Sequence, residues 1–288
     1  MKPVAFELEV PLSISDALAM LADSSREVKP LAGGQSLVPL LNFRLARPDV
    51  LVDLNRLREL QYVRQVDGQL VIGALTRQRA LERSDEVQRL APLVAEVLPW
   101  VGHAAIRNRG TLGGSLAHAD TAAELCLAAL VLDAVVVARS RRGERLIPIG
   151  DFFVGPFTTA LRRDELLVEV RLPVQTPDAG WGFEEVARRR GDFAMVAVAA
   201  TLALSDGTIS DARLAYLSMG PTPLRAPPAE AWLRGQLPNP DAFGHAAELA
   251  MAELQPSDDL HASREYRVHV AKALTRRALA RALQRANG

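Results

Sequence analysis

The 288-residue sequence has few of the residues that build disulfides, metal clusters and membrane spans. Cys126 is its only cysteine, so the chain can form neither an internal disulfide nor a cysteine-ligated iron–sulfur cluster. The five histidines are scattered and lack the spacing of a metal site. No apolar run reaches the about 20 residues of a transmembrane helix. These absences argue against a metal centre and a membrane span in this chain.

The charge balance also excludes some partners. Lys plus Arg and Asp plus Glu both number 34, so no net charge attracts nucleic acid or an anionic membrane. The N-terminal sequence MKPVAFELEVPLS has acidic residues and prolines where a signal peptide has a basic head and an apolar run. We therefore expect a cytoplasmic protein. Cys126 lies in an apolar helical pattern, which favours a packing thiol over a reactive one.

Hydrophobic patterning predicts an α+β protein with a boundary in the turn-rich segment 173–180. Near the N-terminus, strand patterns alternate with a helix at 15–22, for which Ser15 is the expected N-cap. Beyond the boundary, three strands precede three helices, which predicts an antiparallel sheet backed by helices. These predicted segments are strands 182–188, 195–204 and 208–217, and helices 227–235, 241–254 and 263–285.

Two glycine-rich stretches interrupt this pattern. AGGQS (32–36) follows a predicted strand, and RGTLGGSLAHAD (109–120) has neither strand nor helix periodicity, so we predict a loop there. A glycine pair followed by small polar residues lets backbone N–H groups converge on an anion without obstruction by Cβ. Two such loops suit a pyrophosphate, and the alternative is that each pair is only a tight turn. Neither GxGxxG within a βαβ unit nor GxxxxGK[ST] is present, so neither a Rossmann site nor a P-loop is indicated.

Polar side chains beside the glycines favour ligand binding over a tight turn. Ser36, Thr111 and Ser115 add hydroxyl groups. Asp120 and Glu124 add carboxylates suited to ribose or ribityl hydroxyls. Donors and acceptors are therefore close together in the sequence.

These residues carry a resemblance to a known family. The sequence closely resembles the FAD-binding medium subunit of molybdenum hydroxylases, the relatives of xanthine dehydrogenase, carbon monoxide dehydrogenase and bacterial N-heterocycle dehydrogenases. The matching motifs cover essentially the full length: AGGQSLVP (32–39) with RLARP (44–48) and LVDL (51–54), IRNRGTLGGSLAHAD (106–120), ARRRGDFA (187–194) and SDDLHASR (257–264). One departure is Glu184–Glu185, where many relatives have a lysine.

The resemblance implies a fold and a division into domains. A two-lobed PCMH-type FAD-binding domain would span residues 1–175, with lobes of about 1–58 and 59–175. A C-terminal α+β domain, an antiparallel sheet backed by helices, would span 176–288. FAD would lie between the lobes without a covalent bond, partly covered by the C-terminal domain.

The resemblance also implies which residues hold FAD. The two pyrophosphate loops would be formed by Ala32, Gly33, Gly34, Gln35, Ser36 and Leu37, and by Thr111, Gly113, Gly114 and Ser115. Glu124 would contact FAD, with Asp120 and His118 close by, and Leu166 or Leu167 would lie against the adenine or the ring system. Phe193, preceded by Asp192, would lie near the isoalloxazine. Ordinary packing is the alternative for Phe193 and His118, and a solvated strand end is the alternative for the arginines at 188–190.

The implied function is electron transfer within a multi-subunit dehydrogenase. A large subunit with a molybdenum–pterin cofactor and a small subunit with two [2Fe–2S] clusters would be the partners. They would form a heterotrimer that dimerises into an (LMS)2 heterohexamer, in which FAD passes electrons to an external acceptor. No catalytic residue or metal ligand is expected in this chain. Two alternatives stay open: a free-standing flavin oxidase of the vanillyl-alcohol-oxidase type, and a nucleotide-binding assembly module without a redox role.

Overall fold

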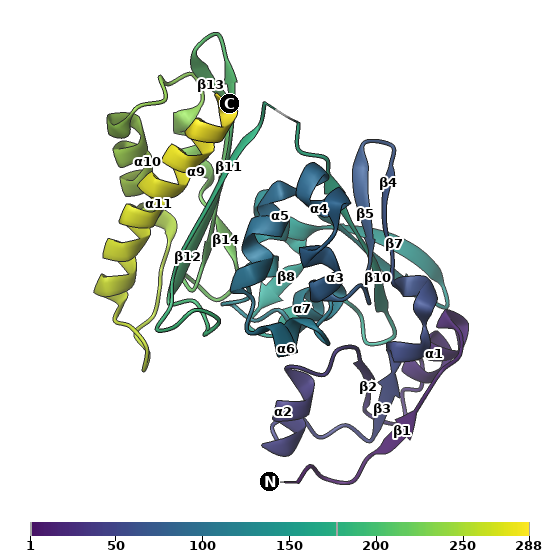
Figure 1. Ribbon diagram of the computed structural model, residues 1–288. Helices are drawn as coiled ribbons and strands as arrows, with labels where there is room; N and C mark the ends of the chain where they lie inside the picture. The colour runs from purple at the N-terminus through teal and green to yellow at the C-terminus, as the bar shows by residue number, and fades with distance from the viewer. Residues whose placement is uncertain (1, 177, 288) are drawn as a thin grey trace.

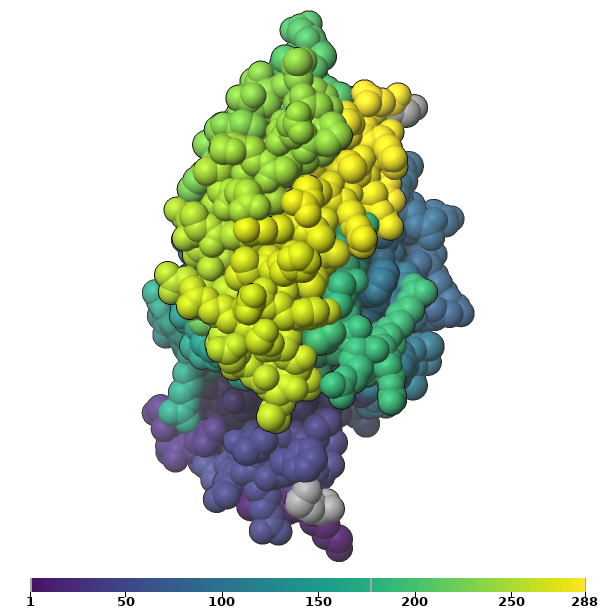
Figure 2. All heavy atoms as spheres, turned by 90° about the vertical axis from the view of Figure 1, so that its left-hand side faces the viewer, coloured from purple at the N-terminus to yellow at the C-terminus, as the bar shows by residue number. Residues whose placement is uncertain are grey.

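The computed structural model describes residues 2–176 and 178–287. Three parts follow one another along the chain: a small N-terminal lobe, a larger second lobe and a C-terminal domain (Figure 1). The C-terminal domain contacts the second lobe, and the first lobe lies at the opposite end of the molecule (Figures 1 and 2). The mixed helix and sheet content confirms the predicted α+β class.

The first lobe contains a parallel sheet in the order β1-β3-β2. Helix α1 begins after Ser13, whose hydroxyl accepts a hydrogen bond from the Asp16 N–H. The N-cap predicted at Ser15 is therefore wrong, because Ser15 lies inside the helix. The elements of this lobe are β1 (Glu7–Glu9), α1 (Ile14–Leu21), β2 (Val28–Leu31), α2 (Leu37–Asn42) and β3 (Val50–Asp53).

The second lobe contains an antiparallel sheet in the order β4-β5-β10-β6-β7. Its last strand inserts between two earlier hairpins and completes the sheet. Every residue of α8 is buried, including Cys126, and burial raises the pKa of that thiol, as expected for a packing residue. The elements are β4 (Val63–Val66), β5 (Gln69–Gly73), α3 (Gln78–Glu82), α4 (Asp85–Leu90), α5 (Pro92–Val97), α6 (Ala104–Arg107), α7 (Leu112–His118), α8 (Glu124–Val131), β6 (Val135–Ser140), β7 (Gly143–Pro148), β8 (Phe153–Gly155), β9 (Thr158–Thr159) and β10 (Leu166–Pro173).

The C-terminal domain is an antiparallel sheet with its strands in chain order, and its helices cover one face (Figures 1 and 2). This is the predicted arrangement. Ser263 caps the last helix, and Asp259 in the matched motif 257–264 forms an ion pair with Arg267 at 2.5 Å. The elements are β11 (Gly180–Val186), β12 (Val196–Ser205), β13 (Thr208–Leu217), β14 (Leu224–Arg225), α9 (Pro227–Leu233), α10 (Pro240–Glu253) and α11 (Arg264–Ala286).

The two faces of this sheet pack against different partners. On β12, Val196 and Val198 belong to the core formed with the helices, whereas Ala197 and Ala199 belong to the core shared with the second lobe. Helix α8 packs against β12 and β13. Small side chains on this face let α8 come close to the sheet. The N-terminal end of α8 therefore lies at the interface between the second lobe and the C-terminal domain.

The second glycine stretch is not a loop as predicted. Residues Leu112–His118 form helix α7, and Thr111 is its N-cap. Leu112 and Leu116 are both buried one turn apart, but one such pair beside two glycines is too short to produce a visible period. Tertiary packing therefore overrides the low helix propensity of the glycines.

Packing of the C-terminal sheet against α11 predicts a strong glycine requirement. A Cβ at Gly182 in β11 would overlap the backbone carbonyl of Ala278 in α11. We expect Gly182→Ala to lower the free energy of unfolding by about 3 kcal/mol, because the helix must move. Gly244→Ala in α10 is the control: its Cβ meets open space, and helix propensity should raise stability by about 0.5 to 1 kcal/mol. Equal effects in urea unfolding would contradict this assignment.

Candidate functional site

The first glycine loop connects β2 to α2. Gly34 has φ of +73°, in the left-handed region that favours glycine. Within the described residues, the backbone N–H groups of Gly33, Gly34, Gln35 and Ser36 donate to no protein acceptor. The Gln35 side chain donates to the Gly33 carbonyl at 3.0 Å and stabilises the turn. Successive unpaired N–H groups of this kind form an anion-binding concavity.

The second glycine stretch uses its backbone donors inside the protein. The Thr111 Oγ1 accepts the Gly114 N–H at 3.0 Å. The N–H groups of Leu112 and Gly113 donate to the carbonyls of Thr76 and Ala74 at 3.2 and 2.9 Å. The Ser115 hydroxyl has no hydrogen-bond partner in the described chain. This stretch therefore offers a hydroxyl and the positive end of a short helix rather than a second run of free N–H groups.

The two stretches meet at their glycines. A Cβ at Gly33 would overlap the Arg109 carbonyl oxygen, and one at Gly114 would lie 3.4 Å from the Ala32 Cβ and 2.6 Å from the Thr111 Oγ1. Glycine at position 33 thus lets the backbones of the two lobes approach each other, whereas glycine at position 114 makes room for the Thr111 hydroxyl of its own stretch. Sequence reasoning placed both stretches at one ligand, and the structure brings them together. It adds that Gly33 is required for contact between the lobes, independently of a ligand.

Two polar residues that sequence analysis missed hold the stretches in place. The Asn55 Nδ2 donates to the Ala32 carbonyl at 2.9 Å. Arg77 donates to the Asn55 Oδ1 at 2.6 Å and also to the Arg109 carbonyl. Asn55 follows directly on the matched motif LVDL (51–54), which is the only signal in the sequence that points to it. Arg77 carries no signal of its own.

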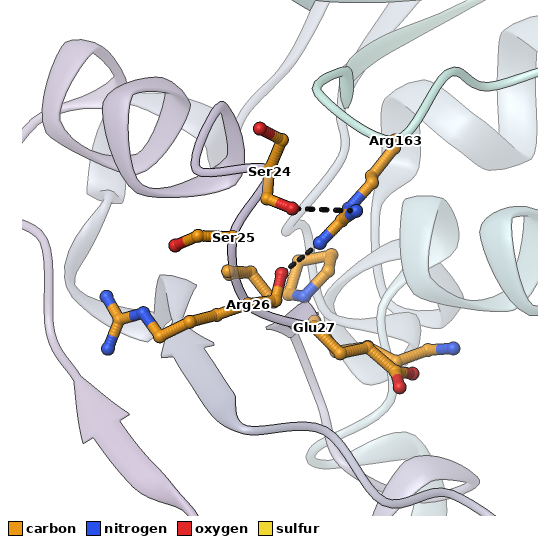
Figure 3. Close-up of a pocket in the computed structure, with 8 residues that line it drawn as sticks. Ser24, Ser25, Arg26, Glu27 and Arg163 are labelled. Carbon is orange, nitrogen blue, oxygen red and sulfur yellow. Dashed lines mark hydrogen bonds between the residues drawn. The ribbon is translucent and has the colours of Figure 1, made fainter.

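A groove of about 590 Å³ runs along the seam between the two lobes at β2 (Figure 3). Arg163, from the segment before β10, points across the seam and donates to the carbonyls of Ser24, at 3.5 Å, and Arg26. It ties the second lobe to the turn that precedes β2. The groove is lined by Ser24, Ser25, Arg26, Glu27, Val28, Lys29, Pro30 and Arg163.

Three predicted site residues lie at the C-terminal end of α7 or shortly after it. The centroid of the His118 ring lies 5.1 Å from that of the Phe157 ring. Burial lowers the pKa of His118, the negative charge of Asp120 opposes this shift, and Lys29 of the first lobe adds to it. An Asp120 carboxylate oxygen accepts the Ala122 N–H at 2.9 Å. Glu124 begins α8 and is 7% exposed. His118 is half-buried and packs against Phe157, which agrees with ordinary packing, the alternative for this residue.

Leu166 and Leu167 lie in β10, and both are buried in protein. Leu166 belongs to the core beneath the first lobe, whereas Leu167 belongs to the core of the second lobe. They face opposite sides of the strand, as the alternation of side chains requires. Their predicted contact with the adenine or ring system rests on the resemblance alone.

The segment after β11 is exposed. Phe193 is 71% exposed, so core packing, the alternative for this side chain, is wrong. Asp192 and the three arginines at 188–190 are also exposed, as expected for a solvated strand end. The Arg190 guanidinium lies 5.1 Å from the centroid of the Trp100 ring in the second lobe. The predicted position of Phe193 near a flavin ring remains a prediction.

Glu184 and Glu185, which stand where many relatives have a lysine, lie in two different environments. Glu184 pairs with Arg281 of α11 at 2.7 Å. Glu185 points the other way, is 9% exposed, and has no hydrogen-bond partner for either carboxylate oxygen. Burial, with the negative charge of Glu124 nearby, raises the pKa of Glu185 to about 8, and burial raises that of Glu124 to about 7. Sequence analysis gave Glu185 no role.

Comparison with known families matches both parts of the chain. Residues 4–175 match the FAD binding domain in molybdopterin dehydrogenase, and residues 181–282 match the CO dehydrogenase flavoprotein C-terminal domain. The chain belongs to this family. It is an FAD-binding medium subunit of the molybdenum hydroxylases, and the resemblance stated above is confirmed.

Similar proteins match over almost their whole length. The 6-hydroxypseudooxynicotine dehydrogenase complex subunit alpha of Paenarthrobacter nicotinovorans is 43% identical, with 99% of this chain and 97% of that one covered. Caffeine dehydrogenase subunit beta of a Pseudomonas species is 41% identical, with the same coverage. The solved carbon monoxide dehydrogenase of Hydrogenophaga pseudoflava matches with a TM-score of 0.97 at 36% identity, covering 99% of both chains. These relatives are subunits of dehydrogenases, which supports the predicted oxidoreductase class.

Two further features of this medium subunit bear on its chemistry. Across residues 2–176 and 178–287, no group of His, Cys, Asp or Glu side chains could hold a metal ion. None of the helices in those ranges is both long and apolar enough to cross a membrane.

The buried carboxyls predict a stability that falls with rising pH. A folded-state pKa raised above the ordinary 4.5 means that the folded chain keeps protons that the unfolded chain has released. The free energy of unfolding of the FAD-free chain should therefore fall by a few kcal/mol between about pH 5 and pH 8. Glu185→Gln should flatten this slope, as measured by urea unfolding at several pH values.

The matched control for this measurement is Glu184→Gln. Glu184 lies on the other face of β11 and pairs with Arg281, so this variant should keep the wild-type slope. A slope that Glu185→Gln leaves unchanged would show that Glu185 does not hold the proton.

Proposed function

We propose that this chain is the electron-transfer subunit of a molybdenum hydroxylase complex. It binds FAD at the seam between its two lobes, takes electrons from [2Fe–2S] clusters of a partner subunit and passes them to an external acceptor. The observation that carries the proposal is the run of unpaired N–H groups from Gly33 to Ser36, held against the second glycine stretch. Family membership supports FAD as the ligand.

The residues at the seam fit the pyrophosphate of FAD. The loop from Ala32 to Leu37 supplies backbone donors, and the stretch from Thr111 to Ser115 supplies hydroxyls and the N-terminal end of α7. Asn55 and Arg77 fix the two stretches relative to each other. The donors are therefore in place before the ligand binds, which lowers the entropic cost of binding.

This chain's own residues position the cofactor rather than transform a substrate. FAD, when bound, supplies the chemistry of collecting electrons and handing them on. The chain contributes donors for the phosphates, carboxyls at 120 and 124 for the ribityl and ring end, and an interface that excludes water around Glu124. We place its domain boundaries at 1–175, with lobes of about 1–58 and 59–175, and at 176–288.

The proposed partners are a large molybdenum–pterin subunit and a small iron–sulfur subunit in an (LMS)2 heterohexamer. A single buried cysteine leaves the clusters to another chain. The relatives' names as subunit alpha, subunit beta or medium chain support a multi-subunit assembly. Full-length matches to such subunits also favour this function over a free-standing flavin oxidase, which needs a larger substrate domain, and over an assembly module without redox chemistry.

The phosphate site predicts a strong preference for FAD over riboflavin. We expect the full chain to bind FAD at least about 100-fold more tightly than riboflavin, because only FAD carries the pyrophosphate. Gly33→Ala should reduce that ratio by about tenfold or more, since the new Cβ separates the loop from Arg109. Quenching of flavin fluorescence measures both affinities.

Gly150→Ala is the control, because a Cβ at Gly150 meets open space, and it should leave the ratio unchanged. The ratio, rather than the FAD affinity alone, separates loss of the phosphate site from partial unfolding. A chain that takes up no FAD, or a Gly33→Ala variant with the wild-type ratio, would refute the proposed site.

A further inference from the structure

Ser218 joins the C-terminal domain to the turn that carries the predicted cofactor carboxyls. It directly follows β13, and its N–H donates to the Thr121 carbonyl of the second lobe at 3.1 Å. Thr121 lies in the turn at 119–123, which connects α7 to α8. The same turn includes Asp120 and leads directly to Glu124. This hydrogen bond therefore reaches the part of the FAD-binding domain where we place the ribityl and ring end of the cofactor.

The same residue also holds the exposed segment before β12. The Ser218 hydroxyl donates to the Ala194 carbonyl at 2.7 Å. Ala194 is buried and directly follows Phe193, whose side chain is 71% exposed. Ser218 therefore contacts, through two different groups, both of the segments that we place at the ring end of FAD.

The backbone at Ser218 has an unfavourable conformation. Its φ of +58° lies in the left-handed region, which costs a non-glycine residue free energy. Phe157 donates its N–H to the Ala119 carbonyl of the same turn at 3.1 Å, and it has φ of +53°. Two residues in this conformation thus donate to one turn, one from the second lobe and one from the C-terminal domain. Such strain persists where the surrounding contacts fix it, and it gathers at functional sites.

Arg267 fixes Ser218 from the side of the helices. This residue of α11 is 4% exposed, and its guanidinium donates to the Ser218 carbonyl at 3.4 Å and to the Met195 carbonyl. Its ion pair with Asp259 sets its position from the segment before α11. Charge-assisted hydrogen bonds to two carbonyls hold the end of β13 and the start of β12 together. A shift of Ser218 would therefore also move the segment that carries Phe193.

We propose that Ser218 is a positioning residue for the flavin ring. Its N–H fixes the turn at 119–123, and its hydroxyl fixes the segment of Phe193, so that the two segments keep one geometry around the cofactor. Neither Ser218 nor Arg267 needs to touch FAD. The inference rests on the proposed function and deepens it, because it makes the orientation of the ring depend on the C-terminal domain as well as on the two lobes.

Ser218→Gly tests this role, since glycine accepts the left-handed backbone without strain and removes the hydroxyl group. In the full chain, we expect the FAD affinity to fall about tenfold, as for the loss of a hydrogen bond to a buried carbonyl. The visible circular dichroism of bound FAD, measured at saturating FAD, should also change, because the ring takes a different orientation. A residue that only stabilises the fold would leave this spectrum of the bound cofactor unchanged.

Asp206→Gly is the matched control. Asp206 has a similar φ of +52°, in the turn that precedes β13, whose ten residues separate it from Ser218 by about 30 Å. This variant should keep the wild-type affinity and spectrum. Wild-type affinity or a wild-type spectrum in Ser218→Gly, or the same changes in Asp206→Gly, overturns the positioning role. A lower ratio of FAD to riboflavin affinity in Ser218→Gly also overturns it, because that result would place the effect at the phosphate end.

Amide hydrogen exchange of the wild-type chain gives a second readout that needs no variant. The Ser218 N–H and the turn at 119–123 should exchange at least about tenfold more slowly with FAD bound, because the cofactor holds the segments that this residue joins. Amides at 206–207, before the other end of β13, should slow less. Equal slowing at both ends, or none at Ser218, overturns the inference. Failure of the wild type to take up FAD is the separate outcome that overturns the proposed function itself.

Discussion

The close approach of two backbones at Gly33 and Arg109 is the contact on which the site depends. Any side chain at Gly33 would overlap the Arg109 carbonyl, so glycine alone lets the two lobes meet there. The N–H groups of the first loop, which lies beside this contact, have no acceptor in the part of the chain that the structure describes. Arg77 and Asn55 then fix the geometry. The contact therefore closes the lobes next to a loop whose donors are available to a ligand.

Much of the fold follows from local patterns that the sequence displays. The strands and helices of the C-terminal domain show periods of two and 3.6, so their order and the antiparallel sheet were predictable. Helix α7 was not, since its glycines and single buried Leu112–Leu116 pair conceal it. The insertion of β10 between β5 and β6 was not predictable either, because pairing between distant strands is a tertiary choice.

From the sequence, the candidate site could be recognised only at positions whose residue types are unusual. Glycine pairs stand out because few positions need them, and they led to both stretches. Asn55, Arg77 and Glu185 are ordinary polar residues that a sequence assigns to the surface by default. Their roles arise from burial and from partners that are far away in the chain, as with Asn55 and Arg77, which are 22 positions apart. Such positions become recognisable only once the packing is known.

The two faces of β12 carry side chains of different size, and this difference explains why carboxyl groups are buried between the second lobe and the C-terminal domain. Valines toward the helices give the C-terminal domain a core of its own, while Ala197 and Ala199 let α8 pack closely on the other face. That close packing buries Glu124 at the start of α8, and Glu185 is buried in the neighbouring strand β11. Two buried carboxyls without a cation destabilise the folded chain unless a proton or a ligand satisfies them. Because burial raises the pKa of Glu185 to about 8, a proton satisfies this side chain at neutral pH, and the stability of the folded chain therefore depends on pH.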